Sequence, residues 1–372
     1  MKRTSRIRWT DEGLLRRVDL RRVDLRRLGL RLAGFAAALL LFALALFLIR
    51  EGVVPIGGRL SQVLPFDSPA RALGFGWLSA SVLLSGSPVA ATALSFHDAG
   101  ILDPSQTFAM IAGSRLGAAF IVLVVGFIHL LRGRHRMLSL GAGLLSLLVT
   151  QTTYLFVLPL GWLILSRDWL APSWIPTAHV ASPFELLLDP IVALIKADLP
   201  PWSLIVVGFL LLLPTFRVFD RLLPELHLEQ SRASGLNRLL YRPEVSFLLG
   251  ALVTTLTFSV SVSLSLLVPL SARGYIRQEN IIPYVMGANI TTFDDTLIAA
   301  ALLGNPTGLT IVLVQMVSVA VVSLAILLLG YRFYQRLLVR LASAIGARRV
   351  SLAVYLVAMF LLPLILLFGG AP

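Results

Sequence analysis

Two short polar motifs stand inside long apolar stretches of this chain, where a lipid environment tolerates few polar groups. The motifs are Gly113-Ser114-Arg115-Leu116-Gly117 and Gly287-Ala288-Asn289-Ile290-Thr291-Thr292, the second followed closely by Asp294 and Asp295. Hydroxyl, amide and guanidinium groups can bind an anion, and carboxylates can bind a sodium ion or carry a proton. Two such motifs at matching places are typical of secondary transporters, which hold their substrate near the middle of the bilayer.

Arg115 carries the fixed positive charge of the first motif. A charge at the centre of a membrane costs at least about 2.5 kcal/mol on insertion scales, so it needs a partner or water. One interpretation is that the guanidinium grips an anion through two parallel hydrogen bonds, at the start of a half-helix whose N–H groups also attract anions. The other is that Arg115 forms a structural ion pair. A third interpretation combines them: the fixed guanidinium stands where the surroundings of a coupling sodium ion would be, which makes anion movement less dependent on sodium. The sequence leaves these interpretations open.

Asp294 and Asp295 lie between Phe293 and a long apolar stretch, which argues against an exposed loop. Neighbouring residues of a helix point about 100° apart, so the two carboxylates cannot face one ligand. We expect one aspartate to face the site and the other to face a neighbouring polar group or Arg115. The site-facing carboxylate can be a sodium ligand, a proton carrier or a structural counter-ion, and we predict that it couples an ion to transport.

Small polar residues also interrupt two apolar hairpins, at Ser85-Gly86-Ser87 and at Ser259 and Ser261. A single serine most often lets membrane helices approach closely, but serines at matching positions in both halves favour a binding site. The predicted substrate-binding residues are therefore Ser85, Gly86, Ser87, Ser114, Arg115, Ser259, Ser261, Asn289, Thr291 and Thr292. Asp294 and Asp295 are the predicted ion-coupling residues, and a sodium ion is expected near Ser259, Asn289 and Asp294.

The sequence does not indicate an enzyme. Its histidines lack the spacing of metal ligands, and it contains neither a Gly-x-Ser-x-Gly nucleophile motif nor a phosphate-binding loop. We therefore predict a transporter with no catalytic residue and no cofactor other than a coupling sodium ion.

The composition indicates an integral membrane protein. Of the 372 residues, 57% are hydrophobic and 14% are charged, and the mean hydropathy is +0.86, whereas about a quarter of an ordinary soluble domain is charged. The net charge of +13 comes from basic residues at the ends of apolar runs and in an N-terminal tail, which suits membrane orientation better than nucleic-acid binding. The absence of cysteine excludes disulfides and thiolate metal sites.

A basic tail at residues 1–31 carries an arginine-rich five-residue unit in tandem, just before the first apolar run. Such a segment is expected to lie on the cytoplasmic face against anionic lipid. We predict a multi-pass protein of the bacterial inner membrane with a cytoplasmic N-terminus. Its expected partners are membrane lipid and a small inorganic or organic anion, and it is compatible with a homodimer.

The order of elements predicts an all-α polytopic fold of two inverted repeats, at residues 32–166 and 201–372, joined by an extracytoplasmic loop at 167–200. Each repeat is expected to contain a span, a re-entrant helical hairpin, a broken transmembrane helix and a closing span. The hairpins are predicted at 73–98 and 246–272, and the helix breaks at Gly113–Gly117 and Gly287–Thr292. The basic segment 332–350 is predicted to form an amphipathic helix along the membrane surface.

Segments of both halves resemble a known family. The second half contains Leu249-Gly250-Ala251-Leu252-Val253-Thr254-Thr255 before its hairpin and Ile282-Pro283-Tyr284-Val285-Met286-Gly287-Ala288-Asn289-Ile290 after it. These segments resemble the sodium-dependent phosphate cotransporters of the type II and bacterial kind. Members of that family have two inverted halves, each with a Gln-Ser-Ser-Ser hairpin and a Gly-(Ala/Ser)-Asn-Ile-Gly-Thr segment. The first half is similar through Ser85-Gly86-Ser87, Ala99-Gly100-Ile101-Leu102 and Gly113 to Gly117, so the resemblance covers about residues 35–370.

The chain departs from the family at the residues that would bind substrate. Leu84 and Phe258 stand where the family has the hairpin glutamines, and Arg115 stands where it has the first asparagine. The resemblance implies secondary active transport of phosphate or a similar small oxyanion, coupled to sodium, by alternating access around a midplane site. An alternative follows from the loss of both glutamines, namely a membrane scaffold or sensor that keeps the transporter fold without transporting.

Overall fold

The computed structural model describes residues 25–57, 66–131, 136–170, 183–222, 242–265, 267 and 278–369. The predicted basic tail up to residue 24, residues 171–182 of the predicted loop and residues 268–272 of the predicted second hairpin lie outside the described residues. The same holds for residues 58–65, 132–135, 223–241, 266, 273–277 and 370–372. Within the described ranges the chain is helical and contains no strand. Five helices in these ranges are long and apolar enough to cross a membrane, which confirms the predicted all-α membrane class.

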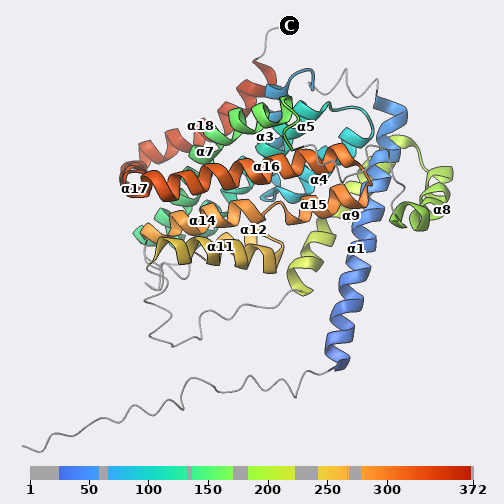
Figure 1. The fold of residues 1–372 in the computed structure, drawn as a ribbon, viewed down its shortest axis with the longest axis horizontal. Helices are drawn as coiled ribbons and strands as arrows, with labels where there is room; N and C mark the ends of the chain where they lie inside the picture. Colours follow the sequence, from blue (N-terminus) through green and yellow to red (C-terminus); the bar gives the residue numbers. More distant parts are fainter. Residues whose placement is uncertain are drawn as a thin grey trace, which may run out of the picture.

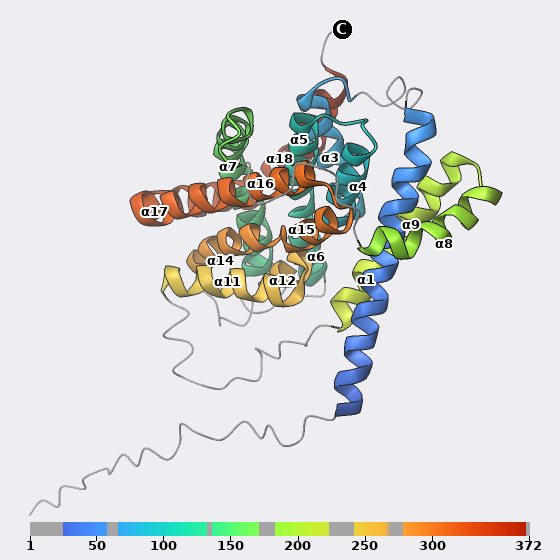
Figure 2. The same cartoon turned by 45° about the vertical axis from the view of Figure 1, so that its right-hand side comes forward.

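The helices follow one another as α1 (Leu25–Val53), α3 (Pro69–Leu83), α4 (Ser87–Asp98), α5 (Pro104–Ala118), α6 (Phe120–Leu131), α7 (Arg136–Ser166), α8 (Pro183–Asp198), α9 (Pro201–Leu222), α11 (Pro243–Thr257), α12 (Val260–Ser265), α14 (Gln278–Thr291), α15 (Asp294–Leu302), α16 (Pro306–Ala325), α17 (Tyr331–Ala347) and α18 (Arg349–Phe368). The short segments η3 (Val54–Ile56) and η5 (Ile326–Gly330) follow α1 and α16. Helices α1 and α9 pack against each other at one side of the molecule, with α8 outside them, and the other helices form a bundle beside them (Figures 1 and 2). The loop predicted at 167–200 therefore contains a helix.

Helices α3 and α5 pack so closely that no side chain fits between their backbones. A Cβ atom on Gly76 would lie 2.2 Å from the carbonyl oxygen of Met110, and one on Gly113 would lie 2.2 Å from that of Leu73. Such separations are far shorter than a carbon–oxygen contact allows. The glycines of the first polar motif thus permit close helix packing, as small residues commonly do between membrane helices.

Helices α11 and α14 repeat these contacts at a constant spacing. A Cβ atom on Gly250 would lie 2.0 Å from the carbonyl oxygen of Tyr284, and one on Gly287 would lie 1.9 Å from that of Phe247. Each of these four residues follows its counterpart in the first pair by 174 positions. The same helix pair is therefore built twice, in the same register.

The ends of α3 and α11 match as well. Leu84 ends the first helix with φ of 54°, and Phe258, 174 positions later, ends the second with φ of 46°. A left-handed residue other than glycine costs roughly 1–2 kcal/mol, so both helices end in a strained turn. Because α4 begins at Ser87 and α12 at Val260, the predicted serine motifs lie in these turns or directly after them.

The helix breaks lie later in the chain than the sequence predicts. Gly113–Gly117 lies wholly inside α5, and Ala119 is the single residue between α5 and α6. In the second half the helix continues through Thr291, and the break consists of Thr292 and Phe293. The predicted break at Gly113–Gly117 was wrong, and the one predicted at Gly287–Thr292 is correct only at Thr292. The glycines of both motifs face a closely packed helix and remain helical.

A bend separates α16 from α17. Gly330 ends the π-helical segment after α16 with φ of −144° and ψ of 16°, values outside the helical region. Figure 1 shows α16 in the plane of the picture and α17 nearly end-on at its left end, so the two axes diverge. Bends of this kind commonly occur at π-helical segments and glycines. The amphipathic helix predicted at 332–350 is thus present as α17, at an angle to α16.

Candidate functional site

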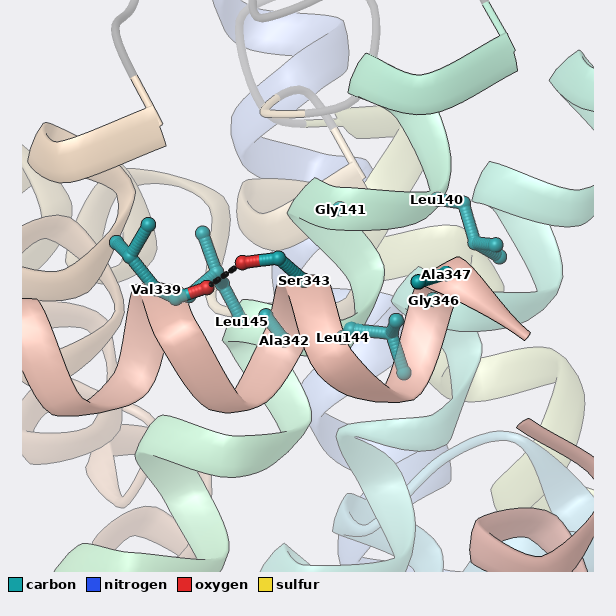
Figure 3. A pocket seen from close by; sticks show the side chains of 9 residues that line it. All are labelled: Leu140, Gly141, Leu144, Leu145, Val339, Ala342, Ser343, Gly346 and Ala347. Atoms are coloured by element: carbon teal, nitrogen blue, oxygen red, sulfur yellow. Dashed lines mark hydrogen bonds between the residues drawn. The ribbon is translucent and has the colours of Figure 1, made fainter. Parts of the chain in front are cut away.

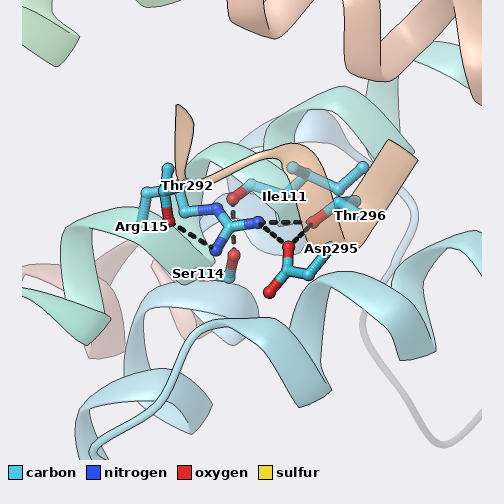
Figure 4. Close-up of polar contacts among 6 residues, drawn as sticks. All are labelled: Ile111, Ser114, Arg115, Thr292, Asp295 and Thr296. Carbon is cyan, nitrogen blue, oxygen red and sulfur yellow. Dashed lines mark hydrogen bonds and ion pairs between the residues drawn. The ribbon is translucent and has the colours of Figure 1, made fainter. Parts of the chain in front are cut away.

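Arg115 of α5 and Asp295 of α15 meet between the first and second halves of the chain. Arg115 Nη1 donates to the Thr292 hydroxyl at 3.2 Å, and Nη2 contacts the Thr296 hydroxyl and lies 3.5 Å from Asp295 Oδ1 (Figure 4). Arg115 is 3% exposed and Asp295 is 7% exposed, so solvent does not screen the pair. The structure thus contains the ion pair that was one interpretation of Arg115.

Two further residues complete the surroundings of the guanidinium. Its carbon atom lies 4.8 Å from the centre of the Phe293 ring, a distance that allows a cation–π interaction. The Thr296 hydroxyl donates to Asp295 Oδ1 at 2.8 Å while it contacts Arg115. The sequence predictions missed both residues. Thr296 directly follows Asp295 in the sequence, and this adjacency was the one signal for it.

Both charged side chains of the pair lie at helix ends whose dipoles stabilise them. Arg115 lies in the last turn of α5, whereas Asp294 and Asp295 lie in the first turn of α15. Cations are stabilised near the C-terminus of a helix and anions near its N-terminus. The expectation that Arg115 begins a half-helix was therefore wrong, because α5 continues to Ala118 and places this residue at a helix C-terminus.

Two buried hydrogen-bond donors near this pair lack an acceptor. Arg115 Nε and the Tyr154 hydroxyl have no hydrogen-bond partner among the described residues. Tyr154 belongs to α7 and is 1% exposed, and its hydroxyl interacts electrostatically with Arg115. Leaving a buried polar group unsatisfied costs about 1–3 kcal/mol. A ligand that accepts hydrogen bonds would therefore be stabilised here, and an anion is such a ligand. Tyr154 was not among the predicted site residues, although it directly follows Gln151-Thr152-Thr153, a polar interruption of an apolar span.

Asp294 has a different partner from its neighbour. The Thr255 hydroxyl of α11 donates to Asp294 Oδ2 at 2.9 Å, and Asp294 is partly buried. The two aspartates thus have different partners, Arg115 for Asp295 and Thr255 for Asp294. That one of them faces a substrate site stays a prediction.

Several predicted site residues lie outside the contacts of Arg115. The Asn289 amide donates to the Thr150 hydroxyl of α7 at 3.1 Å. The hydroxyls of Thr291 and Ser114 donate to backbone oxygens, those of Ala251 at 2.9 Å and Ile111 at 2.7 Å. Of the predicted polar motifs, the structure therefore brings Arg115, Thr292 and Asp295 into direct contact.

The first strained turn packs near Arg115, and the second lies near Asp295. A Cβ atom on Gly86 would lie 2.7 Å from the carbonyl oxygen of Ser114, so the first turn packs on α5 next to Arg115. Ser85 and Ser87 are partly buried there. In the second turn, Phe258 and Asp295 help to line a cavity of about 10 Å³, which is close to the lower limit for one water molecule.

The second serine motif caps a helix. Ser259 Oγ accepts from the N–H of Val262 at 3.3 Å, and Ser261 is partly buried in the first turn of α12. The structure shows no hydrogen bond from either serine to Arg115, Asn289 or Asp294 among the described residues.

A larger cavity lies elsewhere. The cavity of about 310 Å³ in Figure 3 lies between α7 and α17 and is lined mainly by leucine, glycine and alanine. The Ser343 hydroxyl, its one hydroxyl group, donates to the backbone oxygen of Val339. Since no residue of α5 or α15 lines this cavity, it does not form part of the Arg115 site.

The predicted sodium site is not assembled by direct contacts. Asp294 accepts from Thr255, and Asn289 donates to Thr150, so these two side chains have separate partners. Within the described ranges, no three residues of the histidine, cysteine, aspartate and glutamate types cluster as metal ligands.

Comparisons with known proteins found no matching protein-family model, no similar curated protein and no similar solved structure.

Proposed function

We propose that this protein is a secondary transporter of a small anion, and that Arg115 binds the anion. The observation that carries the proposal is a buried guanidinium whose Nε–H lacks an acceptor among the described residues. The Tyr154 hydroxyl, which interacts electrostatically with Arg115, is likewise unsatisfied there. All of these groups donate hydrogen bonds, and arginine forms its strongest ones with oxyanions. The threonine hydroxyls on the guanidinium are also able to contact a bound oxyanion.

The repeated helix pairs support a transporter fold. We infer that the two halves form inverted repeats and that the strained turns at Leu84 and Phe258 are the tips of re-entrant hairpins. Support comes from the constant spacing of 174 residues between matching contacts and between these turns. Transporters built from such repeats place their substrate where the halves meet, and the Arg115–Asp295 pair joins the first half to the second.

Asp295 occupies the place of a substrate anion in this proposal. Its Oδ1 lies 3.5 Å from Arg115 Nη2, longer than the usual 2.7–2.9 Å of a strong charge-assisted hydrogen bond. A substrate oxyanion that binds Arg115 more closely displaces the carboxylate. In this proposal the displaced carboxylate moves toward the small cavity that Phe258 and Asp295 line.

Charge balance then couples the anion to a cation. A displaced Asp295 carboxylate is an unpaired buried charge, and such a charge costs about 3–5 kcal/mol. A sodium ion or a proton removes that cost, so anion and cation bind together. Thr296, which already donates to Asp295, supplies a hydroxyl oxygen for a sodium ion. Asp294 with Thr255 offers a second carboxylate and hydroxyl for the same role.

The resemblance to sodium-dependent phosphate cotransporters makes phosphate and sodium the first ions to test. Purified protein is reconstituted into liposomes, and uptake of radiolabelled phosphate is measured with and without an inward sodium gradient. We expect sodium-stimulated uptake that sulfate or a similar oxyanion reduces by competition. Liposomes with the Arg115→Gln variant are the control, and no uptake by folded protein under any gradient would remove phosphate as the cargo.

A membrane scaffold or sensor is the second candidate. It is favoured by the small volume beside Asp295 and by the contacts that Arg115 already makes with Thr292 and Asp295. A scaffold needs the ion pair only for stability. Screening anions for an increase in unfolding temperature separates the candidates, because a scaffold gains no stability from any small anion.

A further inference from the structure

Helix α17 divides into three faces along its length. One face packs against the protein: Leu338 and Ala342 are buried, and the Tyr334 hydroxyl pairs with that of Thr152 at 2.7 Å. At about 100° per residue, the remaining surface divides into a basic stripe and an apolar stripe that lie side by side. Such a division is typical of helices that lie in a membrane–water interface.

The basic stripe consists of Arg332, Arg336 and Arg340, spaced by four residues and all exposed. None of the three forms an ion pair with an acidic side chain in the described part of the chain. The one contact that restrains them is a hydrogen bond from Arg336 Nε to the backbone oxygen of Arg332 at 3.0 Å. Their guanidinium groups thus keep most donors free for an external anion.

The apolar stripe consists of Phe333, Leu337 and Leu341, which are 71%, 43% and 39% exposed. In water this exposure would be unfavourable, at about 25 cal/mol for each Å² of apolar surface. The stripe continues toward Leu328 and Leu329 in the preceding π-helical segment, which are 76% and 88% exposed. An apolar medium on this side of α17 removes the cost.

The neighbouring helices supply that medium. Helices α16 and α18 both belong to apolar runs able to cross a membrane, and the run that contains α16 extends through α17 to Ala347. The bend at Gly330 divides that run, so α17 connects α16 to α18. Its divergence from the α16 axis (Figure 1) allows it to lie along the surface.

We propose that α17 binds anionic phospholipid, with Arg332, Arg336 and Arg340 on the headgroup phosphates and Phe333, Leu337 and Leu341 among the acyl chains. Charge complementarity favours lipid over a second copy of the chain. A two-fold symmetric contact places the same surface on both partners, so it would bring the two arginine stripes together, and α17 itself contains no acidic residue to pair with them. This inference does not depend on the transport proposal.

Bound lipids provide the first test. The full chain is purified in detergent with equal amounts of phosphatidylglycerol and phosphatidylcholine, and retained lipids are counted by native mass spectrometry. We expect a preference for phosphatidylglycerol that falls about tenfold when Arg332, Arg336 and Arg340 are all changed to Gln, since each basic residue contributes to attraction by an anionic surface. Changing the three to Lys keeps most of the preference. Arg167→Gln, at an exposed arginine beyond α7, leaves it unchanged.

An unchanged preference in the triple Gln variant would overturn the proposal, and so would an equal loss in Arg167→Gln. Because the three arginines are exposed, we expect the variant to keep the unfolding temperature of the native protein in detergent without added lipid. If the triple Gln variant fails to fold, the second test still decides the question on chains that retain all three arginines.

The second test uses the absence of native cysteine. Leu337→Cys and Ser343→Cys each carry one nitroxide label in vesicles that contain phosphatidylglycerol. We expect the label at 337 to collide mainly with oxygen, which concentrates in the acyl region, and the label at 343 to collide mainly with a water-soluble nickel chelate. If the label at 337 collides with the nickel chelate as often as the label at 343 does, this face of α17 is in water. A label at 337 that is closed to both reagents indicates a protein contact. Either result contradicts lipid binding.

Discussion

Arg115 and Asp295 pair across the two halves, although the positions that match them in the repeat carry no charge. The residue 174 positions after Arg115 is Asn289, and the residue 174 positions before Asp295 is Ile121. The 3.5 Å contact between Nη2 and Oδ1 is thus a departure from a repeat that holds closely for glycines and turns. A charged pair at one of two related positions gives the fold one specialised site.

The ion pair predicts a non-additive pattern of stability. Arg115→Gln or Asp295→Asn alone leaves one unpaired buried charge, so each is expected to lower the free energy of unfolding by about 3–5 kcal/mol. The double variant removes both charges and should recover most of this loss. Thermal unfolding in detergent micelles measures all three. Single losses that simply add in the double variant would show that the two charges do not interact.

The repeated close contacts predict equal penalties in both halves. Gly76→Ala and Gly250→Ala place a Cβ atom 2.2 Å and 2.0 Å from a backbone oxygen, and we expect each to destabilise the protein by about 1–3 kcal/mol through overpacking. Gly330→Ala is the control, because nothing lies within 4 Å of its added Cβ atom. The unfolding temperature reports all three. A penalty at one glycine of the pair but not the other would contradict the shared register.

Removing the Tyr154 hydroxyl should affect anion binding and protein stability differently. Tyr154→Phe removes a buried donor that has no partner in the described part of the chain, so the unfolding temperature should stay unchanged or rise. Affinity for the anion should fall about tenfold, the effect of one lost hydrogen bond to a charged group. Tyr334→Phe is the matched control. It breaks the bond to Thr152, so it should cost about 1 kcal/mol of stability and leave anion affinity unchanged. Calorimetry and thermal unfolding provide the two readouts.

Long apolar runs with polar interruptions were sufficient to predict the helical membrane class and the places where α3 and α11 end. Ser85-Gly86-Ser87-Pro88 interrupts an apolar stretch, and the structure has its turn there, directly after Leu84. Such patterns depend on the local sequence alone. Their matching positions in the two halves reflect the 174-residue spacing that the structure shows in its contacts.

Features that depend on tertiary partners were harder to predict. Glycine inside an apolar helix permits either a break or a close contact with another helix. Gly113 and Gly287 make close contacts, with the carbonyl oxygens of Leu73 and Phe247. The surroundings of Arg115 were likewise incomplete in the sequence interpretation. Tyr154 comes from a helix whose approach to α5 no local pattern indicates, and Asn289 turns to Thr150 of that same helix.

Phosphate binding as a function of sodium tests the central claim most directly, for the native protein and for Asp295→Asn. In the native protein, binding of phosphate should strengthen about a hundredfold as sodium saturates, because the cation neutralises the displaced carboxylate. Asp295→Asn should bind phosphate equally well with and without sodium, and at least as tightly as the native protein with sodium. A native affinity that does not change with sodium, matched by the same affinity in folded Asp295→Asn, would contradict exchange of the carboxylate for a substrate anion on Arg115.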